Sequence, residues 1–198
     1  MIENKIELQK ICKSLAVLDA IICEDWEYRY HSYNSKWDED EECYTMRNGQ
    51  GDELLILFKD NACIVNGYIN EKESIDTTSI KKQIPKIFHS FIYKEPIKTI
   101  GTTFVIWTND NGEWNPQDFL NPDSLIEEFL NIYTNTPEKY IEWAIEYYEL
   151  DALAYSDVDY VYKQQPITKD LINNINKDLE DIEALLEELK EIDYPYSL

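Results

Sequence analysis

Two arginines and a histidine lie close together near the start of the chain, and lysine supplies every other strongly basic residue. Arg29 and His31 are two residues apart, and Arg47 stands just before an Asn-Gly-Gln-Gly turn that is followed by Asp52 and Glu53. The planar guanidinium of arginine donates paired hydrogen bonds to carboxylate and phosphate groups. These five residues therefore predict a site for a small anionic ligand on one face of a sheet.

The same residues also have an ordinary structural interpretation. Arginines on neighbouring strands commonly pair with acidic residues across a solvated sheet face, and such pairs need no function. The arrangement in space distinguishes the two interpretations. Arg29, His31 and Arg47 form a ligand site if they meet in a concave pocket, and a solvated face if they are spread over a flat or convex surface.

A second chemical signal is an acidic run that directly follows Trp37. Calcium-binding loops place carboxylates at alternating positions around a glycine. No glycine follows this run, so we expect a solvated loop and no metal site. The residues of the run are Asp38, Glu39, Asp40, Glu41 and Glu42.

The chain carries no motif of a known catalytic centre. It has no nucleophile elbow, phosphate-binding loop, dinucleotide fingerprint or His-Glu-x-x-His pair. Its four cysteines include no Cys-x-x-Cys pair, and His31 and His89 are too far from any cysteine pair to indicate zinc. The sequence therefore predicts no metal and no cofactor, and it favours a binding protein over an enzyme.

The charge of the chain is strongly negative. Forty acidic residues against 18 lysines and arginines give a formal net charge of -22 at pH 7. Such a surface repels nucleic acid and anionic membranes, and it attracts basic proteins. No run reaches the roughly 18 apolar residues of a membrane span, and the first residues do not resemble a signal peptide. With no paired-cysteine pattern, we expect a cytoplasmic protein.

Hydrophobic periodicity predicts the elements that position these residues. Apolar residues at three- to five-residue steps predict a helix over 3–23. Trp26, Tyr28 and Tyr30 then alternate with polar residues, which is the two-residue period of a strand. Short apolar runs separated by tight turns predict an antiparallel meander after that. Its strands are expected at 43–47, 54–58, 62–69 and 102–108, with Trp114 on a hairpin partner of the last.

The C-terminal half is expected to be mainly helical. A stripe over 79–92 and proline-led starts at 122 and 137 predict helices over 79–92, 122–133 and 137–150. Val158–Tyr162 is expected as a strand, and Thr168 as the cap of a short helix. The fold class is therefore α+β, in one domain over 1–198. Leucines line one face of the last helix, 178–192; this stripe packs on its own domain or forms a homodimer seam.

The segment around the arginines resembles a family of uncharacterised bacterial proteins. The shared pattern is Trp-Glu-Tyr-Arg-Tyr-His-Ser-Tyr-Asn-Ser-Lys-Trp, here 26–37, followed by Met-Arg-Asn-Gly-Gln-Gly-Asp, here 46–52. The resemblance extends to an Ile-Asp-Tyr-Pro tail at 192–195 and implies no activity. A histidine is typical of the family after the glycine at 67, and this chain has Tyr68 there.

Two functions are expected from these observations. The first is an acidic cytoplasmic interaction protein that binds and neutralises a basic protein, as toxin-immunity proteins do. In that case the run from Asp38 to Glu42, with Asp52 and Glu53, would pair with basic residues of the partner, and Trp37 and Trp114 would be aromatic anchors. The alternative is a binder of a small anion, or an enzyme, that uses Arg29, His31 and Arg47.

Overall fold

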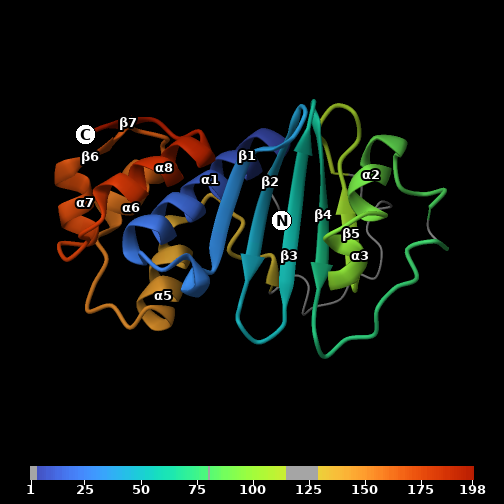
Figure 1. Cartoon of the computed structure of the whole chain (residues 1–198), viewed down its shortest axis with the longest axis horizontal. Coiled ribbons are helices and arrows are strands. Elements are labelled where there is room, and N and C mark those ends of the chain that lie inside the picture. The colour runs from blue at the N-terminus through green and yellow to red at the C-terminus, as the bar shows by residue number, and fades with distance from the viewer. Residues whose placement is uncertain (1–3, 80, 115–128) are drawn as a thin grey trace.

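Five antiparallel strands form the central sheet of this α+β protein, whose computed structural model describes residues 4–79, 81–114 and 129–198 (Figure 1). The strand order is β1-β2-β3-β4-β5, so neighbours in the chain are neighbours in the sheet. This confirms the predicted meander. The strands are β1 (His31–Asp38), β2 (Glu41–Arg47), β3 (Glu53–Lys59), β4 (Ala62–Tyr68) and β5 (Phe104–Trp107).

Two hairpins of this sheet have two-residue loops, and each loop contains an aspartate in the left-handed region. Asp38 pairs with Glu41 across the first hairpin, and Lys59 pairs with Ala62 across the second. Asp40 has a φ of 58° and Asp60 a φ of 50°. Aspartate tolerates this conformation better than most residues, and it suits tight hairpin turns. The turn geometry therefore places acidic residues at the tips of both hairpins.

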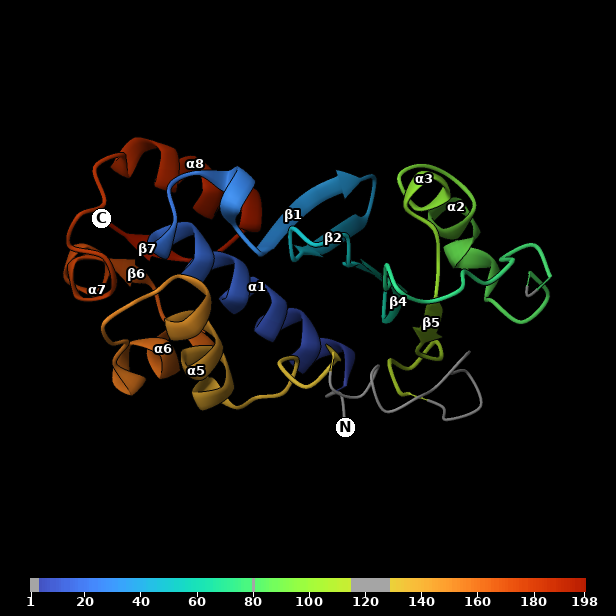
Figure 2. The ribbon, with the colours of Figure 1, turned by 90° about the horizontal axis from the view of Figure 1, so that it is seen from below.

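One face of the sheet is covered by helix α1 (Lys5–Ile22), which confirms the predicted N-terminal helix. The side chain of Asn4 caps it by accepting from the backbone amides of Ile6 and Glu7. The helix is buried on most sides, because the sheet contacts it on one side and the C-terminal helices on the other (Figure 2). Helices buried in this way belong to the core of a fold.

The opposite face is covered only over β3, β4 and β5. Residues 75–79 and 81–100 cross it in short turns that include α2 (His89–Ile92) and α3 (Ile97–Ile100). A second apolar cluster forms there, which includes Phe88, Phe91 and Trp107. Over β1 and β2 no helix of the described residues lies on this face, which is flanked by the C-terminal helices on one side and α2 and α3 on the other (Figure 2).

The described C-terminal part is mainly helical, as expected. The helix predicted from 137 is present, and the Thr168 hydroxyl caps the next short helix by accepting from the amide of Leu171. The elements are α5 (Pro137–Tyr147), α6 (Tyr155–Tyr162), β6 (Ile167–Thr168), α7 (Lys169–Ile175), α8 (Ile182–Ile192) and β7 (Tyr196–Ser197). Helices α6, α7 and α8 pack against α1, and α5 packs against α6 and donates a hydrogen bond from Tyr140 to Asp19 of α1. In the part of the chain that the structure describes, no helix has the length and apolar character needed to cross a membrane.

The leucine stripe of α8 packs inside the chain. Leu185, Leu189 and Ile192 are buried, and α8 contacts α1 and β1. This matches the expectation that the stripe packs on its own domain. These three side chains consequently present no apolar seam to a second copy.

Three elements differ from the sequence prediction. Residues 26–28 form a 3-10 turn, η1 (Trp26–Tyr28), and β1 starts only at His31, so the expected strand over 26–30 is wrong. Val158–Tyr162 is the end of helix α6 and no strand. The described part of the stripe expected at 79–92, residues 79 and 81–92, is broken into turns and short helices, because Pro85 has no amide hydrogen to continue a helix.

The helix expected over 122–133 lies mostly outside the described residues. The described end of that range, 129–133, is mainly turn.

Candidate functional site

The five residues predicted to bind an anion do not form one site. Arg29 is not on a strand: it follows η1, and its side chain is 93% buried. Its guanidinium donates to the carbonyl oxygens of Cys23 (2.7 Å) and Glu24 (2.9 Å) and forms an ion pair with Glu188 at 2.9 Å. Arg29 is therefore held by three groups of the protein itself.

His31 lies in the main core, on the face of β1 that packs against α1. Its Nδ1 atom is hydrogen-bonded to the hydroxyl of Tyr44, and its ring packs against Trp143 at 4.8 Å between centroids. Burial lowers the pKa of His31 from 6.5 to about 3. The expectation that His31 shares a solvated strand face with Arg29 is wrong, and its imidazole is a neutral core group.

Asp52 and Glu53 flank the β2–β3 turn. The Asp52 carboxylate accepts from the side-chain amide of Asn48 (2.7 Å) and the backbone amide of Asn70 (2.9 Å), which fixes this turn to the loop after β4. Glu53 is opposite Arg47 in the strand register, but the two do not form an ion pair. Arg47 instead lies over the ring of Trp26, 4.9 Å from its centroid.

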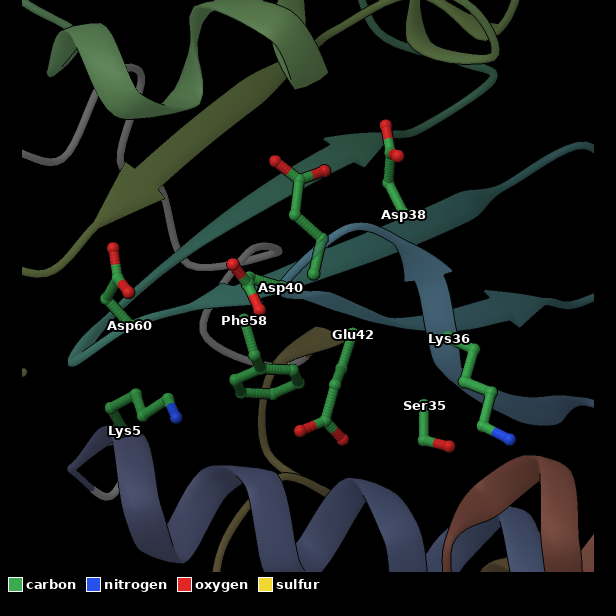
Figure 3. Close-up of a pocket in the computed structure, with 9 residues that line it drawn as sticks. Lys5, Ser35, Lys36, Asp38, Asp40, Glu42, Phe58 and Asp60 are labelled. Atoms are coloured by element: carbon green, nitrogen blue, oxygen red, sulfur yellow. The ribbon is translucent and has the colours of Figure 1, made fainter.

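The acidic run lines a real pocket, which we call the acidic pocket (Figure 3). It has a volume of about 560 Å³ and lies where the tips of both hairpins meet the start of α1. Four members of the predicted run line it, and Glu39 does not. The lining residues are Lys5, Ser35, Lys36, Asp38, Asp40, Glu41, Glu42, Phe58 and Asp60.

Two of the five carboxylates of the acidic pocket form ion pairs with lysines of the chain, and the other three differ from them in this respect. Glu41 pairs with Lys59 at 2.6 Å, and Glu42 pairs with Lys13 at 3.2 Å. Among the described residues, no cation forms an ion pair with Asp38, Asp40 or Asp60. The pocket thus keeps three carboxylates available for positive groups from outside.

A positive group of the protein already lies beside the pocket. The ammonium group of Lys5 lies over the ring of Phe58, 5.8 Å from its centroid, and both residues line the pocket (Figure 3). A ring face attracts cations through its negative electrostatic potential. Phe58 is itself buried and lies beneath Lys5, so the pocket offers an incoming lysine or arginine mainly its acidic groups.

The acidic groups do not form a metal centre. Within the described ranges, no group of three or more His, Cys, Asp or Glu side chains is placed to hold a metal ion. The described cysteines are all free thiols.

A second pocket lies behind the same hairpin, on the part of the opposite sheet face that α2 and α3 leave open, and α8 borders it through Glu188 and Glu191. We call it the tryptophan pocket; its volume is about 350 Å³. Arg29 and Arg47 both line it, which the sequence anticipated, whereas His31 does not. The other lining residues are Trp26, Ser32, Tyr33, Asn34, Trp37, Cys43, Thr45, Glu188 and Glu191.

The two predicted aromatic anchors are placed differently. Trp37 is 38% exposed and lines the tryptophan pocket, and so it lies on the other side of the hairpin from the acidic pocket. Trp114 forms an isolated bridge to Thr108, as expected for a hairpin partner of β5, and it packs half-buried against the main core. Trp114 is thus a poorer anchor than the sequence suggested.

Sequence reasoning missed Asp60, Lys5 and Phe58 in the acidic pocket. No local pattern links them to the acidic run, because only the pairing of β3 with β2 and the packing of α1 bring them there. It also missed the fully buried Asp19. Its carboxylate accepts hydrogen bonds from the hydroxyls of Tyr140 and Tyr148.

No family model, curated protein or solved structure matches this chain. The resemblance to uncharacterised bacterial proteins therefore stays a prediction.

Proposed function

We propose that this protein binds and neutralises a basic protein partner through the acidic pocket, as an immunity-like interaction protein of the cytoplasm. The observation that carries the proposal is the set of three carboxylates, Asp38, Asp40 and Asp60, that line one pocket without an internal ion pair. The formal net charge of -22 adds a long-range attraction for basic proteins.

In this mechanism, a lysine or arginine of the partner enters the acidic pocket. Its charge is shared among Asp38, Asp40 and Asp60. Glu41 and Glu42 keep their lysine partners and define the pocket wall. A partner whose active cleft depends on basic residues is blocked when those residues are held in this way.

The anion-binding alternative has weaker support. Of its three residues, His31 is in the core and Arg29 is neutralised by Glu188, so only Arg47 keeps a charge without an ionic partner among the described residues. A single cation in a chain of this net charge is a weak attraction for an anion.

The test compares two triple variants that remove the same number of charges. The pocket variant is Asp38→Asn, Asp40→Asn and Asp60→Asn; asparagine is compatible with the left-handed turns. The control is Asp178→Asn, Glu180→Gln and Glu183→Gln, three exposed acids in the segment before α8 and in its first turn. Each protein is immobilised, and basic proteins are captured from the native organism at low salt, identified by mass spectrometry and then titrated after purification.

We expect that one basic protein is captured and that salt releases it completely. Its Kd should rise roughly 10- to 100-fold for the pocket variant, the sum of three interactions of about 0.5–1 kcal/mol each. The control variant should stay within about threefold of the original protein. Equal weakening by both variants would mean that net charge alone drives capture, and the pocket mechanism would be wrong.

A further inference from the structure

The tryptophan pocket has features that binding of a basic protein does not use. It lies on the opposite face of the β1–β2 hairpin from the acidic pocket. Its walls include two tryptophans with exposed rings: Trp26 is 56% exposed and Trp37 is 38% exposed. Large aromatic side chains left open to solvent in a pocket mark a place where a ligand can cover them.

The floor of the pocket is polar and small. Ser32 and Thr45 are directly opposite each other on β1 and β2, and Asn34 is opposite Cys43. In the described part of the chain, the Ser32 hydroxyl and the side-chain NH₂ group of Asn34 have no hydrogen-bond partner. The serine hydroxyl can both donate and accept a hydrogen bond, and the asparagine NH₂ group can donate one. Both groups suit a ligand that carries hydroxyl groups.

The charges of the pocket cancel. Arg29 and Arg47 are matched by Glu188 and Glu191, and Arg29 is directly paired with Glu188. An anionic ligand would meet the two glutamates as well as the net charge of the chain. A cationic ligand would meet the two arginines, and Arg47 already covers one face of Trp26. The balance favours a neutral ligand.

The pocket is also elongated. Its β2 residues run from Cys43 to Arg47, about 13 Å apart at roughly 3.3 Å per residue of strand. Trp26 lies beside Arg47, at one end of this run, and Trp37 follows the β1 residues that pair near the other end. A ligand that contacts both tryptophans is therefore a chain of linked units and no single small ring.

From this combination we infer that the tryptophan pocket binds a neutral oligosaccharide. The apolar faces of sugar rings pack on Trp37 and on the exposed part of Trp26. Ring hydroxyls bond to Ser32 and Asn34 on the floor, and the Arg47 guanidinium donates to ring oxygens from the side. The site is separate from the acidic pocket, so this inference does not depend on the proposed neutralisation of a basic partner.

The test begins with the purified full-length chain on an array of neutral, sialylated and sulfated oligosaccharides. We expect retention on neutral glycans only. The strongest neutral glycan is then titrated by calorimetry and by tryptophan fluorescence, which should change on binding because two exposed rings become covered. Retention only on sialylated or sulfated glycans, or on none, would overturn the inference.

Variants locate the site. Trp37→Ala should weaken binding about tenfold or more, as expected when one stacking surface is lost, and Trp37→Phe should restore part of it. Ser32→Ala should weaken it less. Tyr196→Ala is the matched control, because Tyr196 is an exposed aromatic residue (41%) outside both pockets.

The acidic-pocket triple variant should bind the glycan as the original protein does, which separates this inference from the proposed function. If Trp37→Ala binds the glycan normally while circular dichroism shows it folded, the glycan lies elsewhere and the inference is wrong.

Discussion

Asp19 and His31 are two buried ionisable residues whose pKa values shift in opposite directions. Burial raises the pKa of Asp19 from 3.8 to about 7, although two tyrosine hydroxyls and two backbone amides donate to its carboxylate. Burial lowers the pKa of His31 from 6.5 to about 3. The folded protein therefore prefers the neutral form of both residues.

These shifts oppose each other between about pH 4 and pH 6.5. In that range the folded state holds one proton on Asp19, and the unfolded state holds one proton on His31. Since both states bind the same number of protons, the pair adds little pH dependence to the free energy of unfolding.

Replacing either residue should reveal the pH dependence that the other contributes to the free energy of unfolding. In Asp19→Asn, His31 is protonated below about pH 6.5 in the unfolded state but stays neutral down to about pH 3 in the folded state. The free energy of unfolding should therefore fall as the pH falls from 6.5 towards 3. In His31→Gln, the contribution of Asp19 is present below pH 3.8 and is lost as the pH rises through about 7. Urea unfolding of both variants between pH 4.5 and 7.5 measures the slopes. Parallel curves would contradict the assigned shifts, because the other carboxylates are common to both variants.

At the scale of elements, the sheet has one position where the backbone approaches an aromatic ring closely. Gly67 on β4 is directly opposite Phe104 on β5, and a Cβ atom at Gly67 would lie 2.0 Å from the Phe104 ring. Phe104 is fully buried and has no free space to move into. The glycine is therefore needed for the ring to pack across the two strands.

Gly67→Ala should lower the free energy of unfolding by about 1–3 kcal/mol, the range for overpacking a dense core. Chemical denaturation measures the loss. The double variant Gly67→Ala and Phe104→Leu should be more stable than the sum of the two single changes implies, because the smaller side chain makes room for the added methyl group. Additive losses would mean that the two residues do not compete for the same space.

Much of the sheet was predictable because its strands have short apolar runs and its turns have glycine, asparagine or aspartate. The failure at 26–30 has a local cause. Arg29 donates to the carbonyls of Cys23 and Glu24, which curls the backbone into a 3-10 turn and leaves Trp26 and Tyr28 exposed. The alternation of aromatic and polar residues there does not reflect alternating sheet faces.

The failure at 158–162 comes from reading β-branched residues as a strand. Val158, Val161 and Tyr162 are three and four positions apart, and they form the buried face of α6. Packing against α1 outweighs their weaker intrinsic preference for helix. The residue types alone do not distinguish a strand from a helix in this segment.

At the scale of the whole molecule, neither pocket is visible in the sequence as a unit. The acidic run was found, but Asp60 and Lys5 join it only through strand pairing and helix packing. In the same way, Glu188 reaches Arg29 from the far end of the chain. The residues predicted for the anion site are separated for the same reason. Arg29 lies beside Glu188 of α8, whereas His31 is buried in the core.

The acidic pocket should lower the stability of the protein that carries it. Three carboxylates that form no ion pair within the described residues repel one another, although Lys5 and Lys36 line the same pocket, and the net charge of -22 adds to this repulsion. The variant Asp38→Asn, Asp40→Asn and Asp60→Asn should therefore be more stable than the original protein at low salt, by about 0.5–1 kcal/mol. High salt screens these exposed charges, so the gain should shrink in 0.5 M NaCl.

Thermal or urea unfolding at the two salt concentrations measures this difference. A variant that is more stable at low salt and binds its basic partner more weakly would show that the pocket sacrifices stability for binding, as functional sites commonly do. If the variant is instead less stable at both salt concentrations, the three aspartates stabilise the hairpin turns, and the pocket does not lower the stability of the protein.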